Sequence, residues 1–377
     1  MTNAGLYIHI PFCKKACHYC NFHFSTQLKY KEEMLNCILL EIEQRAKNHK
    51  SYHIQSIYFG GGTPSILEES EILQLLQKIH TELNISENAE ITLEANPDDL
   101  DLKKLKALYS AGINRLSIGI QSFFDSHLEW MNRSHNSYQA INSIQDARQI
   151  GFEEINADLI FALPRMDMQQ WISNIQSFID LDLTHWSCYN LTIEPKTALH
   201  HQVTKKGLMA VSQDEAAIQY QTLLQMAQGA GMEHYEISNF CKPGKFAIHN
   251  SNYWKGVPYL GVGPSAHSFD GTKRSWNIAN NALYMRTVSQ GGSYASEEIL
   301  SDATKYNEYI MTGLRTKWGC NVQKIETHGT NFKAHFLSEV QPFIAKGWMQ
   351  CDTDIYTLTN TGKLFADHIS SELFWVD

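Results

Sequence analysis

The chain has 377 residues, of which 43% are hydrophobic and 19% are charged. This composition is ordinary for a folded globular protein and excludes an intrinsically disordered one. The acidic side chains outnumber the basic ones by 40 to 31, giving a formal net charge of −9, which argues against a nucleic-acid-binding protein because such proteins usually carry a basic face. Chains of this length usually divide into more than one hydrophobic core, so we expect one large and one smaller domain.

The N-terminus carries no targeting signal that we can read. Residues 1–5 lack the basic and apolar regions of a signal peptide, and an apolar run follows at once. No stretch of 18 consecutive apolar residues occurs, so the sequence predicts no transmembrane anchor. We therefore expect a cytoplasmic protein.

Apolar runs alternate with helical patterns through the first two thirds of the chain. The runs predict six strands, at residues 6–10, 56–59, 90–94, 115–121, 155–163 and 185–193. Apolar residues spaced three and four apart predict helices at residues 30–47, 72–83, 102–108, 138–150, 169–181 and 214–230. Strict alternation of strand and helix predicts a parallel sheet, and the richness of the strands in Ile, Leu, Phe and Tyr is typical of strands buried on both faces.

Polar side chains stand at the ends of several predicted strands, among them Glu94, Gln121, Asp158 and Asn190. Polar groups that converge from many strand ends are typical of the mouth of a barrel. Six strand–helix units are too few to close an eight-fold barrel. We therefore predict an α/β fold with a partial (β/α)6 TIM-type barrel over residues 1–235.

The remainder of the chain has a different pattern. A stretch rich in glycine and proline, residues 242–264, interrupts the alternation, so we treat residues 236–298 as a connecting segment. Residues 299–377 predict a small, helix-rich α+β domain. Its predicted elements are helices at 306–317 and 332–346, a β-hairpin that includes a strand at 355–358, and a last helical segment at 361–369.

Three of the eight cysteines crowd together, namely Cys13, Cys17 and Cys20. Thiolates are soft ligands that favour zinc or iron–sulfur clusters. A structural zinc usually takes four protein ligands, which His18 or His23 would have to complete. A 4Fe–4S cluster held by only three thiolates leaves one iron open to a small molecule, so the three-cysteine spacing favours a cluster.

The spacing CxxxCxxC directly after a first strand resembles the radical S-adenosylmethionine (SAM) superfamily. Together with the string from Tyr7 to Cys13, YIHIPFC, and the later GGGTP, residues 60–64, it is similar to the branch that holds oxygen-independent coproporphyrinogen III oxidase and the HemW-type haem chaperones. The resemblance implies a 4Fe–4S cluster on Cys13, Cys17 and Cys20, with SAM on the fourth iron. It also implies an electron donor, since one electron splits SAM to a 5′-deoxyadenosyl radical.

The resemblance also implies which residues meet SAM. Within their motifs, the positions that match those near the cofactor are Tyr7, Tyr19, Gly62, Thr63, Glu94, Gln121, Arg133 and Asp158. These residue types suit the ligand, because carboxylates accept hydrogen bonds from ribose hydroxyls and a guanidinium pairs with a carboxylate. Taken one at a time, each residue is also open to a purely structural role.

Two features separate the chaperone from the oxidase. The oxidase carries a further cysteine two residues after the third one, where this chain has Phe22, and it has a longer N-terminal extension. The string HNSNYW, residues 249–254, is similar to the HNxxYW signature of the chaperones. That similarity implies His249 as a haem ligand, a role that suits a neutral imidazole. Lys242, Lys245 and Lys255 around it are candidates to bind haem propionates or are ordinary solvated lysines.

The sequence therefore predicts a haem chaperone that binds a 4Fe–4S cluster, SAM and haem and delivers haem to haem-requiring respiratory proteins, approaching the membrane only from its periphery. Whether it also cleaves SAM productively stays open. The first alternative is an oxygen-independent coproporphyrinogen III oxidase, which converts two propionates of its substrate to vinyl groups. The second is a barrel stabilised by zinc without radical chemistry.

Overall fold

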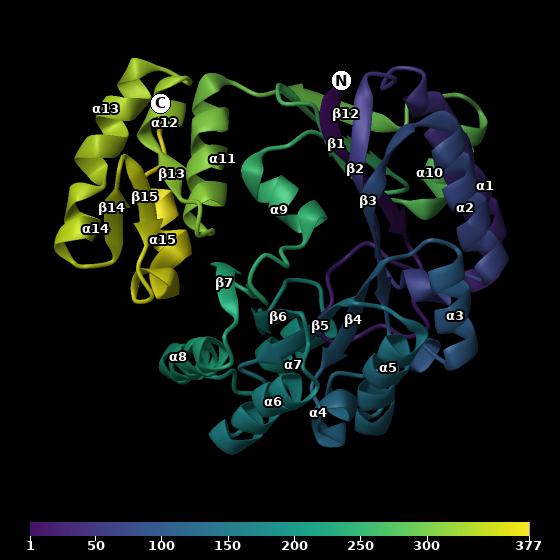
Figure 1. Cartoon of the computed structure of the whole chain (residues 1–377), viewed down its shortest axis with the longest axis horizontal. Coiled ribbons are helices and arrows are strands. Elements are labelled where there is room, and N and C mark those ends of the chain that lie inside the picture. Colours follow the sequence, from purple (N-terminus) through teal and green to yellow (C-terminus); the bar gives the residue numbers. More distant parts are fainter. Residues whose placement is uncertain (377) are drawn as a thin grey trace.

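The computed structural model describes residues 1–376, and its largest feature is a 12-stranded sheet (Figure 1). Six strands in the middle of this sheet pair in parallel and in chain order. They are β1 (Thr2–Ile10), β2 (Tyr52–Gly61), β3 (Asn84–Ala95), β4 (Arg115–Gln121), β5 (Glu154–Phe161) and β6 (His185–Asn190). The predicted series of six parallel strands is confirmed.

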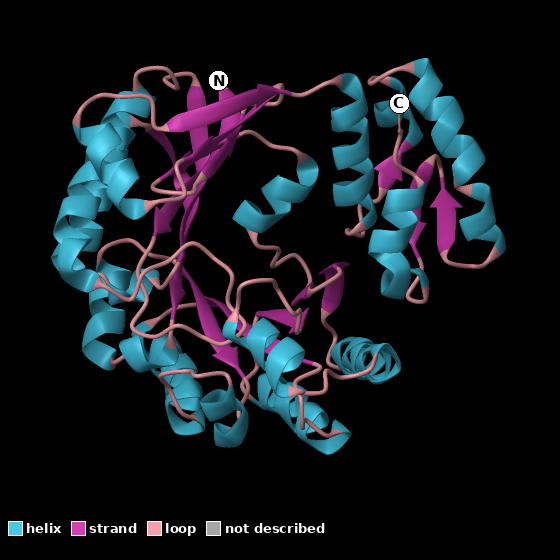
Figure 2. Cartoon of the chain, turned by 180° about the vertical axis from the view of Figure 1, so that it is seen from behind, coloured by secondary structure: helices cyan, strands magenta, loops and turns pink. Residues whose placement is uncertain are grey.

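Helices connect these strands, and Figure 2 shows them along the outer, convex side of the curved sheet. The six predicted helices are present as α1 (Lys31–Ala46), α2 (Glu69–Glu82), α3 (Leu102–Ser110), α5 (Ser137–Ile150), α6 (Met168–Asp180) and α8 (Gln213–Gly229). Two further helices, α4 (Asp125–Trp130) and α7 (Ala198–Lys206), are too short to show a clear apolar period. Short 3₁₀ turns complete the connections at Leu28–Tyr30, Pro64–Ile66 and Pro97–Asp99.

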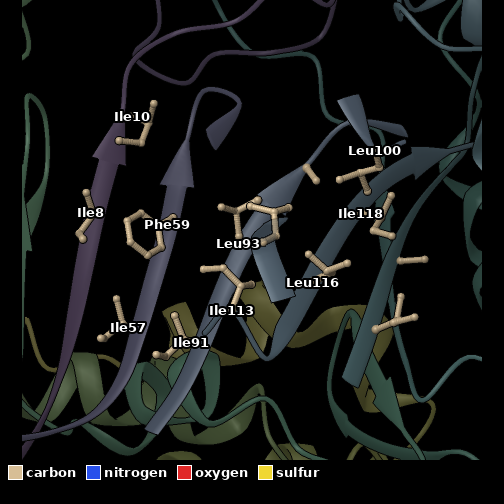
Figure 3. Packing of buried hydrophobic residues seen from close by; sticks show 14 of the residues in the cluster. Ile8, Ile10, Ile57, Phe59, Ile91, Leu93, Leu100, Ile113, Leu116 and Ile118 are labelled. Carbon is tan, nitrogen blue, oxygen red and sulfur yellow. The ribbon is translucent and has the colours of Figure 1, made fainter. Parts of the chain in front are cut away.

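The two faces of the parallel strands differ in chemistry. Side chains alternate between faces along a strand, and the set that packs under the outer helices is apolar, as Figure 3 shows for Ile8, Phe59, Leu93 and Leu116. The alternate positions face the concave side and are often polar, among them Glu94 and Asp158. The expectation of strands buried on both faces is met in β4, where every residue is buried, but the concave face also carries polar side chains. The concave face supplies the functional side chains.

Both edges of the sheet are extended by strands that the sequence did not predict. Beside β1 lie β9 (Tyr259–Val262), β10 (His267–Phe269), β11 (Lys273–Asn277) and β12 (Ala295–Ile299), and beside β6 lie β8 (Asn239–Cys241) and β7 (Glu233–Glu236). Residues 236–298, which we expected to be a connecting segment, thus add strands to the core sheet, together with α9 (Ile248–Lys255) and α10 (Asn281–Ser289). In the described chain β12 and β7 are the two ends of the strand order, so the barrel is open, as predicted.

The C-terminal domain has its own hydrophobic core, which runs from Tyr306 to Leu373. It consists of α11 (Asp302–Leu314), α12 (Val322–Glu326), α13 (Thr330–Glu339), α14 (Gln341–Ala345), a 3₁₀ turn (Gly362–Phe365) and α15 (Ala366–Glu372), with a sheet in the order β13 (Cys320–Asn321), β15 (Ile355–Leu358), β14 (Met349–Asp352). The predicted hairpin is β14–β15. The single helix predicted at 332–346 was wrong: α13 ends at Glu339, and after Val340 a separate helix begins at Gln341 with Pro342 in its first turn.

The domain lies across the open side of the barrel, with α9 between it and the sheet (Figures 1 and 2). The two domains meet where α11 packs against α9. Within residues 1–376 no helix combines the length and the apolar character needed to cross a bilayer.

Candidate functional site

A cavity of about 1070 Å³ opens at the carboxyl ends of the parallel strands. Its volume is at the upper end of what ligand pockets usually have. Its walls include these residues predicted from the sequence: Cys13, Cys17, Cys20, Tyr19, Gly62, Thr63, Glu94, Gln121, Arg133 and Asp158. The structure thus brings the predicted cluster and SAM residues together, with the exception of Tyr7, and it does not bring His249 to the cavity wall.

The cysteine loop follows β1 and is fixed by the end of β2. The backbone N–H groups of Gly62 and Thr63 donate to the carbonyls of Ile10 and Phe12, at 2.9 and 2.7 Å. A Cβ atom on Gly62 would lie 2.6 Å from the Phe12 carbonyl oxygen, so no other residue permits this approach without a shift of the backbone. The GGGTP string therefore positions the cysteine loop as well as lining the cavity.

The other side of the loop is held by the end of α4 and the residues that follow it. The His18 ring Nδ1 donates to the Trp130 carbonyl at 2.7 Å, and the Asn132 side-chain amide donates to the Ala16 carbonyl at 2.8 Å. His23 binds Asn281 through Nε2 at 2.7 Å. Each of the two histidines considered for a zinc site therefore already has a hydrogen-bond partner outside the cysteine trio.

Two of the three thiols receive hydrogen bonds from side chains. The Thr63 hydroxyl donates to Cys13 Sγ at 3.3 Å, and Arg133 Nη1 donates to Cys17 Sγ at 3.4 Å. Burial raises the pKa of Cys13 to about 11, and the Thr63 hydrogen bond acts against this shift. Because iron binds the thiolate, loading a cluster must release these protons, and donors aimed at sulfur favour the ionised form.

The arrangement of the cysteines suits a cluster better than a single ion. In the part of the chain that the structure describes, no three His, Cys, Asp or Glu side chains converge closely enough to hold one metal ion. In a cluster each thiolate binds a different iron, so the ligands need not converge on one point. Three thiols on one cavity wall, two of them with donors to sulfur, fit such a group.

Arg133 is a buried cation beside the cysteines. Its Nη2 donates to the Asn96 side chain at 2.6 Å and to the Gly119 carbonyl at 2.7 Å, while its Nε has no hydrogen-bond partner. Burial acts to lower the pKa of Arg133, but Tyr19 and Cys17 raise it above its ordinary value. The guanidinium thus keeps its charge and a donor that no protein group satisfies, as a site for a ligand carboxylate requires.

Two carboxyl groups line the cavity near this cation. Tyr58 donates to Glu94 at 2.8 Å, and the Asn156 amide donates to Asp158 at 2.8 Å. Burial, together with the charge of Asp158, raises the pKa of Glu94 to about 7, and burial raises the pKa of Asp158 to about 6. Perturbed carboxyls in a cavity are typical of functional sites, and these two can hydrogen-bond sugar hydroxyls.

Gln121 ends β4 with a φ of 66°. A non-glycine residue in this left-handed region is strained, and such strain is often found at functional sites. The conformation places the buried Gln121 in the cavity wall.

Tyr7 and His249 belong to a layer behind the cavity wall. The Tyr7 hydroxyl bonds His9 Nδ1 at 3.1 Å. The ring of His249, on α9, stacks on Tyr58 at 5.0 Å between centroids, with Nδ1 bonded to Ser56 at 2.8 Å and Nε2 to Tyr253 at 3.0 Å. Burial lowers the pKa of His249 to about 3, so the ring is neutral. Both ring nitrogens are engaged, and the ring is linked to the cavity through Tyr58, which donates to the cavity residue Glu94.

The lysines around HNxxYW also have partners. Lys242 pairs with Asp182 at 2.7 Å, Lys245 pairs with Glu154 at 2.6 Å, and the ammonium of Lys255 lies 4.2 Å from the ring centroid of Trp318. None of the three is among the residues that line the large cavity.

Sequence reasoning missed several residues of the site. Asn96 orients Arg133, and it stands in the same EANP string as Glu94, which was a usable signal. Tyr58 supports Glu94 from β2 and had no signal of its own. The wall contributed by Arg315 and Lys363 comes from the C-terminal domain, so only the fold reveals it.

Comparison with known proteins shows the family of this chain. The radical SAM superfamily model matches residues 7–177, and the HemN C-terminal domain model matches residues 300–365. The heme chaperone HemW of Bacillus subtilis (strain 168) is 34% identical over 367 residues, which cover 96% of this chain and 97% of that protein. The chain belongs to the HemW family.

Similar proteins occur in animals, and the fold of this chain matches a solved structure. The mitochondrial radical S-adenosyl methionine domain-containing protein 1 of Danio rerio is 37% identical over 336 residues, covering 86% of this chain and 76% of that protein. The structure of coproporphyrinogen III oxidase (HemN) from Escherichia coli aligns with a TM-score of 0.86 at 23% identity, over 99% of this chain and 90% of that one. This second likeness shows the fold, an open α/β barrel with an added C-terminal domain.

Membership of the radical SAM superfamily implies a 4Fe–4S cluster and SAM as cofactors, and the name HemW implies haem. The thiols, the buried guanidinium and the two carboxyls of the cavity fit the first two groups.

Proposed function

We propose that the chain is a haem chaperone that binds a 4Fe–4S cluster, SAM and haem and passes haem to haem-requiring respiratory proteins in the cytoplasm or at the membrane periphery. The observation that carries the proposal is that one cavity joins the cysteine loop, the strand-end carboxyls and a wall of the C-terminal domain. SAM at the cysteines leaves the rest of this space to a second ligand. The HemW relatives support haem as that ligand.

The proposal gives each site residue a role in binding the cluster or SAM. Cys13, Cys17 and Cys20 hold the cluster. Arg133 binds the SAM carboxylate with the donor that the protein leaves unsatisfied. The remaining predicted SAM contacts are the ribose hydroxyls to Glu94 and Asp158, the amino group to Gly62 and Thr63, and contacts from Gln121 and Tyr19, with Tyr7 behind them. When reduced by an electron donor, a bound cluster and SAM supply radical chemistry.

His249 remains the predicted haem ligand. Coordination of iron requires one of its nitrogens to leave Ser56 or Tyr253, so this role needs a local rearrangement that opens the buried ring to a ligand. The role of the HNxxYW motif and the role of the cavity in haem binding can therefore be tested separately.

The second candidate function is an oxygen-independent coproporphyrinogen III oxidase. The oxidase function is favoured because the cavity is continuous from the proposed SAM residues to the wall formed by the C-terminal domain. A substrate bound against that wall would lie next to the SAM site. Phe22 stands against it. This side chain is 69% exposed and lines the cavity where the oxidase pattern has a cysteine.

Anaerobic turnover separates the two functions. The reconstituted protein is mixed with SAM, a strong reductant and coproporphyrinogen III, and protoporphyrinogen IX and 5′-deoxyadenosine are measured together. We expect no protoporphyrinogen IX, and in a parallel assay we expect bound haem to move to an apo-protein of the respiratory chain. Protoporphyrinogen IX formed in proportion to SAM cleaved would overturn the chaperone proposal.

A further inference from the structure

The cavity wall formed by the C-terminal domain has no role in the cluster or SAM proposal. It contains two basic side chains, Arg315 and Lys363. Their surroundings differ, and the difference indicates which of them is available to an anionic ligand.

Arg315 is already neutralised. Its Nη2 lies 3.1 Å from Glu236, which is 2% exposed, and its Nη1 lies 3.3 Å from Asp367. Its guanidinium also lies over the ring of Trp254, 5.5 Å from the centroid. A cation with two carboxylates beside it has little attraction left for a third.

Lys363 has only neutral partners. Its Nζ donates to His234 Nδ1 at 2.9 Å and contacts the Asn360 side-chain oxygen at 3.3 Å. His234 Nε2 donates to the Ile237 carbonyl at 3.1 Å, so Nδ1 is the acceptor, and burial together with Lys363 lowers the pKa of His234 to about 3. Within residues 1–376, no ion pair joins Lys363 to a carboxylate.

The environment of Lys363 is unfavourable for an isolated charge. The side chain is half-buried, and burial lowers its pKa to about 8. A partly desolvated ammonium gains more from an anionic partner than a solvated one does. An anion in the cavity would supply the missing counter-charge.

Flat apolar side chains line the same cavity. Phe161 and Tyr220 stack at 6.0 Å between centroids, and Leu364 and Phe365 adjoin Lys363 in the chain. A cation beside aromatic surface suits a ligand with a flat apolar body and carboxylates at its edge. Haem has this shape, with two propionates on one edge.

We infer that Lys363 is the subsite for a carboxylate of the tetrapyrrole, so that haem lies in the cavity with its propionate edge toward the C-terminal domain. This assignment rests on the proposed haem-binding function and deepens it. It concerns the carboxylates alone and requires no particular ligand for the iron. It also differs from the expectation that the lysines around HNxxYW bind the propionates, since those lysines have other partners.

Haem titration of the full-length protein tests the assignment. We expect Lys363→Met to weaken haem binding at least about tenfold, the scale of a hydrogen bond between charged groups, and Lys363→Arg to stay within a few-fold of wild type. Lys333→Met is the matched control, because Lys333 lies in the same domain, pairs with Glu326 at 2.8 Å and is absent from the cavity wall. Equal thermal unfolding of the variants confirms that each one folds.

Haem dimethyl ester, which lacks the free carboxylates, makes the test specific. Wild type should bind the ester at least about tenfold more weakly than haem, whereas Lys363→Met should bind the two with similar affinity. If wild type binds haem and Lys363→Met keeps the wild-type preference for haem over the ester, the assignment is overturned while the proposed function stands. If wild type binds neither compound, the proposed function fails and the assignment with it.

Discussion

The cavity and the surroundings of His249 are built from similar side chains, but they leave different atoms available to a ligand. In the cavity, Arg133 keeps a donor without a partner, and Glu94 and Asp158 have raised pKa values. On α9, both nitrogens of the His249 ring are bonded to hydroxyl groups of the protein. The first region is arranged to receive a ligand, whereas the imidazole of the second is already satisfied.

The difference shows what a motif can predict. The residue types in CxxxCxxC and HNxxYW indicate which ligand atoms are available. The fold decides whether those atoms face a cavity or are already hydrogen-bonded to neighbouring side chains. The cysteines follow a strand end, where parallel strands open into a cavity. His249 lies on a helix packed against the concave face of the sheet, where neighbouring side chains fill the space.

The largest expected effect is the loss of the cluster from the cavity. Cys17→Ala removes one of three cluster ligands, so we expect the iron of the anaerobically reconstituted protein to fall from ~4 atoms per chain to near zero, with thermal unfolding of the metal-free protein almost unchanged. Iron analysis and circular dichroism measure the two quantities. Cys351→Ala is the control, because Cys351 is exposed in the C-terminal domain. Full iron content in the Cys17 variant would contradict the cluster assignment.

Substitutions in the surroundings of His249 should change the stability of the protein. His249→Ala deletes a buried ring and leaves Ser56 and Tyr253 without their partner, so we expect the free energy of unfolding to fall by about 4 kcal/mol. Tyr253→Phe removes one hydrogen bond and should cost about 1 kcal/mol. Urea denaturation measures both changes. A His249→Ala protein of wild-type stability would break the comparison, because the ring and its two hydrogen bonds would then contribute nothing to the fold, whatever the role of the imidazole toward haem.

The smallest effect is a pH dependence in the cavity. The folded pKa of Glu94, about 7, lies above its ordinary value of 4.5, so between these values the folded protein holds a proton that the unfolded chain has lost. Stability from this group is therefore lost as the pH rises through 7. Glu94→Gln has no such loss, and its advantage in unfolding free energy over wild type should grow by about 2–3 kcal/mol from pH 5 to pH 8.

Urea denaturation of the protein without ligands, at a series of pH values, measures this difference. Glu339→Gln, at an exposed position of the C-terminal domain, is the control and should show a nearly constant difference. A Glu94→Gln curve parallel to that of wild type would show that Glu94 is not desolvated. The raised pKa of Glu94 would then no longer distinguish the cavity from the surroundings of His249.

The sequence was sufficient to locate the helices and strands that have a sustained apolar pattern. β4 was predicted with its observed bounds, Arg115–Gln121, and the other central strands and six helices were located to within several residues. Short strands that extend the sheet, such as β10, His267–Phe269, show no period, and they are stabilised by pairing with neighbours on both sides. For this reason the connecting segment was not recognised as part of the sheet.

The same limit applies to the site. Residues at strand ends were predictable, because a parallel sheet brings those ends together whatever the loops do. The hydrogen bonds that occupy His249 were not, since Ser56 lies on a different element, β2, far away in the chain. Lys363 was missed because the placement of one domain against the other leaves no trace in local periodicity.

The division of the cavity wall between two hydrophobic cores has a kinetic consequence. A ligand that contacts both the barrel and the C-terminal domain would lose the contacts of one wall whenever the two domains part. Its residence time is then set by how often the two bodies part. An acceptor protein that wedged α11 away from α9 would shorten that time without competing for a single ligand atom.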